Sequence, residues 1–434
     1  MKVSVVKISQ LCFIFSFATA IAVGTLLLRI PACLTGDAAL SWVDAAFTAT
    51  SAVCVTGLVT IKVCDLSWMG QSIVLLLIQM GGLGIMALSA SILVMLGRHL
   101  SYGGTLIMST VTDRFSMRGT ESLFRIVLKY TLACEAAGFV LLFPLFWLAE
   151  GLVWYQAIWC ALFHAVSAFC NAGISTLPEG MMQAGMWTKL VVALLFISGG
   201  LGVYVVYDIH VSRKKHLLLH AQTRLILSWS AALLVGGTVL LWLIQLLAGT
   251  PLGWVDAFFQ SAACRTAGFN SVSLDALHGC SIMVMVCLML IGAAPGSTGG
   301  GMKLTTVALV AAGLYSTFKG TDRVILYKRG IPPENVLKAF VLLVTYVLLV
   351  AGGTILLCMF TPCDVSWALF ESASALGTVG LALENPQPLS TAGKILLIGF
   401  MFLGRVGIFT FFLFLLGRER RSRLVYPEER MVMN

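Results

Sequence analysis

One short segment recurs four times along the chain. In each copy a glycine follows a phenylalanine by ten residues, and the residues between them are mostly small and weakly polar. The copies begin at Phe47, Phe163, Phe258 and Phe370 and end at Gly57, Gly173, Gly268 and Gly380. Four copies of one unusual segment in a single polypeptide predict four quasi-equivalent units around a shared axis.

The surrounding sequence is too apolar for a soluble protein. Of 434 residues, 59% are apolar and only 11% are charged, and the mean hydropathy is +0.96. A soluble globular protein of this size cannot bury so much apolar surface, so the sequence predicts a polytopic membrane protein. The 12 cysteines have no C-x-x-C spacing and no paired histidine pattern, which favours small apolar side chains over disulfide, metal or redox groups.

Positive charge is distributed unevenly between the two sides of the predicted membrane. Of 28 Lys and Arg residues, 21 lie in the N-terminus, three long loops and the C-terminal tail, and four lie on the opposite side. This positive-inside pattern predicts a plasma (inner) membrane protein whose two termini and loops 97–122, 210–224 and 317–338 are cytoplasmic. It also accounts for the net charge of +9 without a nucleic acid partner. Cleavage of the first apolar run, 11–28, as a signal peptide is an alternative, but it would remove the helix that opens the first repeat.

The lengths of the apolar runs predict the same order of elements in each repeat. Runs of about 18 residues or more can cross a bilayer, whereas runs of about 10–14 are typical of re-entrant segments. The predicted fold is an all-α polytopic membrane protein with four pseudo-fourfold repeats of helix, pore loop and helix, giving eight transmembrane helices and four re-entrant half-helices. The repeats cover residues 1–97, 122–210, 223–316 and 334–417, and a cytoplasmic tail covers 418–434. The half-helices are expected at 43–54, 156–170, 253–265 and 365–377, and the second helices at 69–97, 186–210, 279–316 (interrupted) and 392–417.

A second glycine marks each repeat at a nearly constant distance from the first. Gly81, Gly199, Gly292 and Gly404 follow the segment glycines by 24, 26, 24 and 24 residues. Small residues at these positions would let the second helices approach closely around the axis. Ordinary enrichment of glycine in membrane helices is the alternative explanation.

The repeated segment has the properties of a filter for a monovalent cation. Non-helical backbone after a half-helix exposes carbonyl groups, which membrane proteins tolerate only where the backbone is buried or lines a watery path. Four such loops can replace the water shell of a cation, and glycine permits the backbone angles that aim the carbonyls inward. The absence of a ring of acidic residues in the segments disfavours a divalent ion. Asp44 and Asp256, near the starts of their half-helices, are expected to act as helix caps or to attract ions, and Glu371 to be structural.

The four loops resemble the pore loops of the Trk/Ktr/HKT potassium transporters. The loops read Val55-Thr56-Gly57, Asn171-Ala172-Gly173, Thr266-Ala267-Gly268 and Thr378-Val379-Gly380. Length and a short N-terminus make the chain most similar to the KtrB branch of this superfamily. The resemblance implies a potassium filter built from these twelve residues, a homodimer, and a cytoplasmic nucleotide-binding ring of the KtrA/TrkA type, with no organic cofactor in this chain. Because Asn171 and Ala172 depart most from the family pattern, a sodium-coupled symporter or a less selective transporter of potassium and sodium is the alternative.

Between Leu290 and Thr306 the second helix of the third repeat is expected to break. Five glycines and a proline cannot sustain a helix there. A phosphate-binding loop is disfavoured because Met302 separates the last glycine from Lys303, and the segment lies inside an apolar span. A flexible segment just below a filter favours an intramembrane gate, whereas a loop that only relieves packing is the alternative. The candidate gate residues are Gly292, Pro295, Gly296, Ser297, Thr298, Gly299, Gly300, Gly301, Lys303 and Arg405.

Two arginines lie within predicted spans, where charge is costly and usually functional. By resemblance, Arg405 faces the pore below the filter and repels a resting cation; a structural arginine that hydrogen-bonds carbonyls of the broken helix is a compatible alternative. Arg265 is expected to brace the outside of its filter loop rather than to line the pore. The basic clusters 213–215, 319–329 and 418–423 either set the topology or dock an acidic partner ring or anionic lipid. His216 and His220 are expected to be solvated.

Three other classes of function are less consistent with the sequence. An alternating-access symporter is expected to have inverted repeats, whereas these repeats are parallel. An intramembrane enzyme would need paired catalytic groups within the spans, and none is present. A structural scaffold would not be expected to contain four filter loops. The sequence therefore predicts uptake of potassium ion through one central path per chain, and no enzymatic activity.

Overall fold

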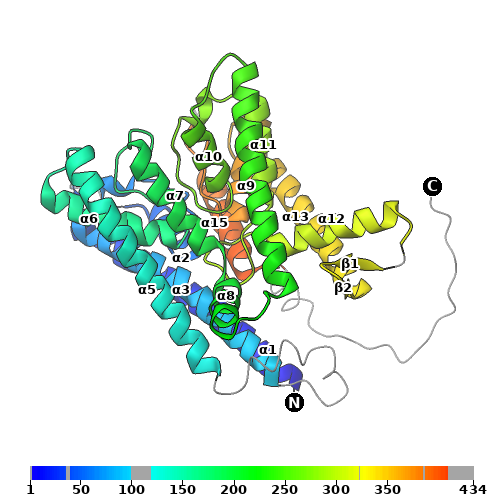
Figure 1. Cartoon of the computed structure of the whole chain (residues 1–434). Helices are drawn as coiled ribbons and strands as arrows, with labels where there is room; N and C mark the ends of the chain where they lie inside the picture. The colour runs from blue at the N-terminus through cyan, green and yellow to red at the C-terminus, as the bar shows by residue number, and fades with distance from the viewer. Residues whose placement is uncertain (1, 36–39, 99–118, 322, 385–386, 409–434) are drawn as a thin grey trace.

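The computed structural model describes residues 2–35, 40–98, 119–321, 323–384 and 387–408 (Figure 1). The regular structure of these residues is mostly helical, as the sequence predicts. The longer helices are α1 Lys2–Leu28, α3 Trp68–Arg98, α5 Gly119–Pro144, α7 Met186–Gly200, α8 Val203–Lys215, α9 Ala221–Leu247, α11 Gly279–Leu290, α12 Leu304–Phe318, α13 Pro333–Phe360 and α15 Thr391–Val406. The tail 418–434, the basic cluster within it and most of the loop 97–122 lie outside the described residues.

Four short helices lie among the longer ones, within two residues of the bounds expected for the half-helices. They are α2 Trp42–Cys54, α6 Trp154–Phe169, α10 Trp254–Ala263 and α14 Val365–Gly377. Each packs on the long helix that precedes it and on the second helix of the neighbouring unit. The contacts α3 with α6, α7 with α10, α11 with α14 and α15 with α2 close a circle. The fourth unit therefore packs against the first.

The second helices depart from the expected spans. The segment expected as one helix over 186–210 is two helices, α7 and α8, bent by 87°. The helix expected over 392–417 ends at Val406, and its residues 409–417 lie outside the described part of the chain. The cause is the same in both places: Gly202 and Gly407 have φ angles of 82° and 90°, which a right-handed helix cannot accommodate.

These breaks change the number of helices that can cross a bilayer unaided. Among the described residues, three single helices are long and apolar enough to do so: Arg125–Ala149, where η3 (Leu145–Ala149) extends α5, and the helices α9 and α13. The bent pair α7 and α8 passes the same test together. Several apolar helices of this length are consistent with a polytopic membrane protein.

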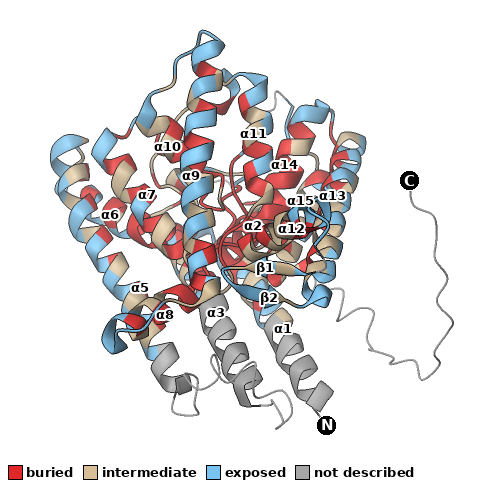
Figure 2. Cartoon of the chain, turned by 45° about the vertical axis from the view of Figure 1, so that its right-hand side comes forward, coloured by how far each residue is buried: buried red, intermediate tan, exposed pale blue. Residues whose placement is uncertain are grey.

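Burial is distributed as a membrane solvent requires. The C-terminal halves of the short helices are almost entirely buried, whereas their first turns and the outer faces of the long helices are exposed (Figure 2). Those outer faces carry large apolar side chains, such as Val140, Leu148 and Leu348, each about two-thirds exposed or more. Exposed apolar surface on this scale is stable in lipid but not in water.

Exposed tryptophans cluster at the starts of helices. Five of them open or nearly open a short helix or a second helix: Trp42, Trp68, Trp154, Trp187 and Trp254. Tryptophan is enriched at membrane–water interfaces, where an amphipathic ring lies at head-group level. The short helices therefore begin near one interface and end within the protein.

A β-hairpin follows α12 and was not predicted. Strand β1 (Val324–Leu326) pairs antiparallel with β2 (Arg329–Ile331), with Val324 opposite Ile331. The turn residues Tyr327 and Lys328 have φ angles of 49° and 62°, a conformation usually supplied by Asn-Gly. The Tyr327 hydroxyl lies 2.6 Å from the Ser228 hydroxyl at the start of α9, which fixes the turn against the helices.

Candidate functional site

Each short helix ends in a loop with the same backbone conformation. In all four loops the segment glycine and the residue two positions before it have positive φ angles. The pairs are Val55 and Gly57, Asn171 and Gly173, Thr266 and Gly268, and Thr378 and Gly380, with φ between 49° and 106°. Positive φ at a β-branched residue such as Val55 or Thr378 is costly and persists only where the surroundings impose it.

The four loops meet one another in a ring, here called the loop ring. A β-carbon added to one loop glycine would meet the carbonyl oxygen of the residue that precedes the glycine of the next loop. This relation runs from Gly57 to Ala172, from Gly173 to Ala267, from Gly268 to Val379 and from Gly380 to Thr56. Because it returns to its start after four steps, the loops are related by an approximate fourfold rotation. The structure brings all twelve predicted filter residues together in the loop ring.

Glycines of the second helices pack closely against the backbone just before three of these loops. A β-carbon on Gly81, Gly199 or Gly404 would collide with the carbonyl oxygen of Val53, Phe169 or Leu376, respectively. Each of those carbonyls lies four residues before a loop glycine. In the third repeat Gly292 instead approaches the carbonyl oxygens of Gly300 and Met302. These glycines therefore permit a close approach in three repeats, but between the second helix and the end of the short helix of the same repeat, and local packing replaces it in the third repeat.

Serine hydroxyls six residues before a loop glycine fix the loop. Ser51 Oγ accepts a hydrogen bond from the Gly57 amide at 3.0 Å, and Ser374 Oγ accepts one from the Gly380 amide at 3.1 Å. In the second repeat Ser167 donates to the carbonyl of Ile174 at 2.7 Å. The third repeat has Ala262 at this position and lacks the contact.

Two buried ionisable side chains brace the residues that follow the loop ring. Both His164 and Glu371 lie nine residues before their loop glycine. His164 Nε2 lies 2.8 Å from the hydroxyl of Ser175, and Glu371 accepts a hydrogen bond from the Leu383 amide at 3.2 Å. Glu371 thus has structural contacts of the kind expected. His164 was not singled out from the sequence, although its position matched that of Glu371.

Residues 291–303, here called the crossing segment, are non-helical and connect α11 to α12. Their part 298–301 crosses beneath the loop ring. Thr298 donates from its hydroxyl to Asn171 Oδ1 at 2.8 Å and to the Phe169 carbonyl at 3.2 Å. A β-carbon on Gly299 would meet Thr266 Oγ1, one on Gly300 would meet Thr378 Oγ1, and one on Gly301 would approach the Gly377 carbonyl. Consecutive residues therefore contact the second, third and fourth loops in turn.

The first half of the crossing segment packs on the bend between α7 and α8. The Val203 amide donates to the Gly296 carbonyl at 3.0 Å, and a β-carbon on Gly202 would lie 2.6 Å from the Pro295 carbonyl oxygen. Ser297 closes a local turn by donating its hydroxyl to the Ala294 carbonyl at 2.6 Å. The bend between α7 and α8 in the second repeat therefore packs directly against the crossing segment of the third repeat.

Arg405 links the crossing segment to the first repeat. Its guanidinium donates to the Thr298 carbonyl and, at 2.9 Å, to the carbonyl of Gly81. No acidic side chain of the described residues lies within ion-pairing distance of it. The contact with Thr298 is of the kind expected of a structural arginine that bonds the broken helix, whereas Gly81 lies in α3 and was not an expected partner. Lys303 is bonded similarly, with its ammonium donating to the Gly299 carbonyl at 2.8 Å.

Other charged residues lie away from the centre of the loop ring. Arg265 donates to the carbonyl and hydroxyl of Ser230 on α9, as a brace outside its own loop would. The expectation that Asp44 caps α2 is wrong, because Ser41 is the cap and Asp44 is the third residue of the helix. Asp44 instead pairs with Lys394 at 2.6 Å.

The pair between Asp44 and Lys394 joins the fourth repeat to the first, and two other junctions carry polar contacts of the same kind. Asp256 pairs with Lys189 at 2.7 Å, joining the second repeat to the third. Trp159 donates to Gln71 at 2.6 Å, joining the first repeat to the second. Each contact joins a second helix to the following short helix.

One expectation for the loop 210–224 needs a correction. His220 is not fully solvated: its Nε2 lies 3.6 Å from the carboxylate of Asp208, and its amide donates to the same carboxylate at 3.0 Å. Asp208 also accepts a hydrogen bond from Thr223 at 2.7 Å. These contacts hold the start of α9 against α8, a constraint that the sequence spacing alone did not indicate.

Comparison with known proteins gives consistent relatives over nearly the whole chain. The profile of the TrkH family, described as cation transport protein, matches residues 16–417. The Ktr system potassium uptake protein B of Vibrio alginolyticus is 34% identical over 96% of this chain and 93% of its own length. The potassium/sodium uptake protein NtpJ of Enterococcus hirae is also 34% identical, over 96% of this chain and 95% of its own length.

A solved structure has the same fold. The potassium transporter TrkH from Vibrio parahaemolyticus superposes with a TM-score of 0.75, covering 94% of this chain and 85% of that chain at 21% identity. The family profile, the relatives and the solved structure all span nearly the full length of the chain. The chain therefore belongs to the TrkH family of cation transport proteins.

Proposed function

We propose that this protein takes up potassium ion through a path along the axis of the loop ring. The observation that carries the proposal is the ring of carbonyl groups supplied by Thr56, Ala172, Ala267 and Val379, each facing the glycine of the preceding loop around the ring. Backbone oxygens arranged around an axis can replace the water shell of an alkali cation. The name of the relative from Vibrio alginolyticus, a potassium uptake protein, supports the choice of ion.

The proposed gate is the crossing segment with Arg405. An ion that leaves the loop ring would meet residues 298–301 directly below it, so transport requires this segment to move. Its five glycines between 292 and 301 favour such movement. Arg405 would hold the closed position through its two carbonyl contacts, and its charge would oppose a resting cation.

A less selective path for potassium and sodium is the second candidate. The second loop, with Asn171 and Ala172, departs from the Thr-Val pattern of the fourth, and the relative NtpJ is named for both ions. The amide oxygen of Asn171 is engaged by Thr298, so this loop is also tied to the proposed gate. The two candidates differ in the ratio of potassium to sodium uptake.

The proposed assembly is a homodimer in the plasma membrane, with both termini cytoplasmic and a cytoplasmic nucleotide-binding ring as regulatory partner. The word "system" in the name of the Ktr relative from Vibrio alginolyticus supports association with another subunit. The basic residues 213–215 at the end of α8 are exposed and available to a partner or to anionic lipid.

Growth of a potassium-uptake-deficient bacterium at low potassium tests the function. We expect the parent to rescue growth, and the serine variants of the four loop glycines to lose potassium preference, because a β-carbon at each would meet a carbonyl of the next loop. Gly352→Ser is the matched control, since the space around Gly352 is open. Failure of the parent to rescue growth, or equal loss in Gly352→Ser, would contradict the proposal.

A further inference from the structure

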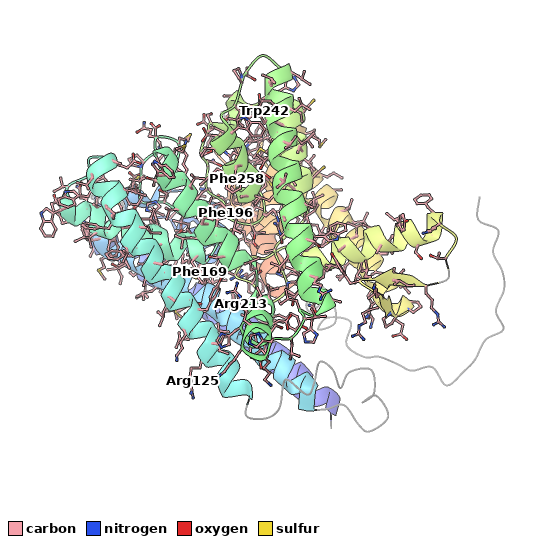
Figure 3. The ribbon with its side chains drawn as sticks, in the orientation of Figure 1. Arg125, Phe169, Phe196, Arg213, Trp242 and Phe258 are labelled. Carbon is pink, nitrogen blue, oxygen red and sulfur yellow. The ribbon has the colours of Figure 1, made fainter. Side chains whose placement is uncertain are left out.

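A cavity of about 220 Å³ opens between α7 and α9, outside the loop ring. Its walls come from α7 and the bend after it, from α9, from the end of α10 and from the crossing segment. The residues that matter here are Phe196, Leu201, Ala231, Leu234, Arg265 and Ala293. In Figure 3, Phe196 lies well above Arg213, which is on α8.

The walls of the cavity are apolar except at one place. Ser230 and Arg265 are its polar side chains, and Arg265 donates both of its bonds to Ser230. A guanidinium has five N–H donors, and the buried Nε of Arg265 has no partner. No acidic side chain among the described residues pairs with it. A cation in an apolar membrane pocket without a counter-ion is unfavourable unless a ligand supplies the negative charge.

The position of the cavity indicates what kind of anion can reach it. Ser230 is the tenth residue of α9, so it lies about 14 Å along the helix from its first residue. Ala231, beside it, is exposed on the outer face, so the cavity opens toward lipid. A carboxylate has two oxygens that fit the fork of a guanidinium, and a fatty acid is apolar beyond them, as the remaining walls of the cavity are, whereas a phosphodiester lipid carries further polar ester and head-group atoms.

We propose that this cavity binds the carboxylate of a fatty acid, which pairs with Arg265 while its alkyl chain lies against α7 and α9. The ligand would fill the space between the bend at Leu201 and Ala293 of the crossing segment. The Ala294 amide already donates to the Gly200 carbonyl at 3.2 Å, so the occupied cavity would reinforce a contact that holds the segment beneath the loop ring. Fatty acid binding should therefore lower cation flux.

Photo-crosslinking tests the binding without any transport readout. The full chain in phosphatidylcholine nanodiscs is labelled with a diazirine-bearing fatty acid, and the labelled peptides are mapped. We expect labelling within 196–201 or 227–234, reduced about tenfold in Arg265→Gln, since the lost ion pair is worth on the order of 1.4 kcal/mol or more. Ala231→Phe, which fills the exposed mouth of the cavity, should also lose labelling, and Ser230→Ala, which keeps the charge, should retain it.

Competition and flux complete the experiment. Oleate should compete with the probe, whereas oleyl alcohol and phosphatidylglycerol should not; equal competition by either would overturn the assignment to a carboxylate. Oleate in phosphatidylcholine proteoliposomes should lower rubidium flux of the parent but not of Ala231→Phe. Equal labelling of the parent and both cavity variants would overturn the site, and unchanged flux would overturn its effect on the gate. Because labelling does not depend on transport, it stands apart from the proposed function.

Discussion

The four repeats are alike in the loop ring but differ from one another in the layer directly beneath it. In the loop ring every glycine has the same relation to the next loop, and both left-handed positions recur four times. In the layer beneath, α3 continues as a helix past Gly84, α7 and α15 end before Gly202 and Gly407, and the third repeat is interrupted by the crossing segment. The four repeats are therefore uniform in one layer and different in the next.

This difference corresponds to two physical tasks. A cation held by carbonyl oxygens needs them at similar distances on all sides, which favours equivalent loops. A gate needs one part that moves while its neighbours stay in place, which favours unequal repeats. Substitutions in the lower layer should therefore change the rate of transport, and substitutions in the loop ring should change ion preference.

The largest effect is expected for Arg405→Ala. The substitution removes two charge-assisted hydrogen bonds, each worth about 1.5–3 kcal/mol, that hold the crossing segment to Gly81. Rubidium flux into proteoliposomes should rise about tenfold or more, because 1.4 kcal/mol corresponds to one factor of ten, while the ratio of potassium to sodium flux stays the same. Arg405→Lys, which keeps the charge without the planar fork, should give an intermediate flux. An altered ratio of potassium to sodium flux with an unchanged rate would contradict this account, because it would assign ion preference to the lower layer.

The next effect is on stability, for Gly404→Ala. Its β-carbon would collide with the Leu376 carbonyl at the end of α14, and overpacking of this kind costs about 1–3 kcal/mol. The thermal unfolding temperature in detergent should fall. Gly399→Ala in the same helix is the matched control, because nothing lies near its β-carbon, and it should not lower the unfolding temperature. A similar fall in both variants would contradict the role of the close approach, because alanine has a higher helix propensity than glycine and would not by itself destabilise the helix.

A smaller loss is expected when the junction between the fourth and first repeats is broken. Lys394→Met leaves Asp44 without its ion pair, which should lower the free energy of unfolding by about 1 kcal/mol for a partly exposed pair. Adding Asp44→Asn should restore much of the loss. If the double variant is less stable than Lys394→Met alone, the pair is not what holds this junction.

The smallest effect is expected for Ser374→Ala in α14, which holds the fourth loop of the loop ring. Loss of its hydrogen bond to the Gly380 amide should cost about 1 kcal/mol, which corresponds to roughly a fivefold change in ion preference at most. Competitive uptake of potassium against sodium measures the change. The third repeat already has Ala262 at this position, so Ala262→Ser provides the reverse test and should not reduce potassium preference.

The regular parts of the fold could be predicted because they repeat. The lengths of the apolar runs located the four short helices within two residues, and the second glycines at Gly81, Gly199 and Gly404 make close backbone contacts. The interruption between Leu290 and Leu304 was also predictable, since a glycine-rich run with a proline cannot sustain a helix.

The parts that break the repeat were harder to predict. Gly202 and Gly407 each follow a packing glycine by three residues, as Gly84 does, yet only the first two terminate a helix. Gly202 adopts a positive φ where it packs on Pro295 of another repeat, a contact with no local sequence signal. The roles of Asp44 and His164 were missed for the same reason, because their partners Lys394 and Ser175 are set by tertiary packing.

The account depends most directly on where an ion lies, and a crystal structure with rubidium, read by anomalous diffraction, measures that position. We expect a peak on the axis of the loop ring, at similar distances from the carbonyl oxygens of Thr56, Ala172, Ala267 and Val379. A peak coordinated by side chains elsewhere, with none inside the loop ring, would contradict the proposal that these four loops form the path of the ion.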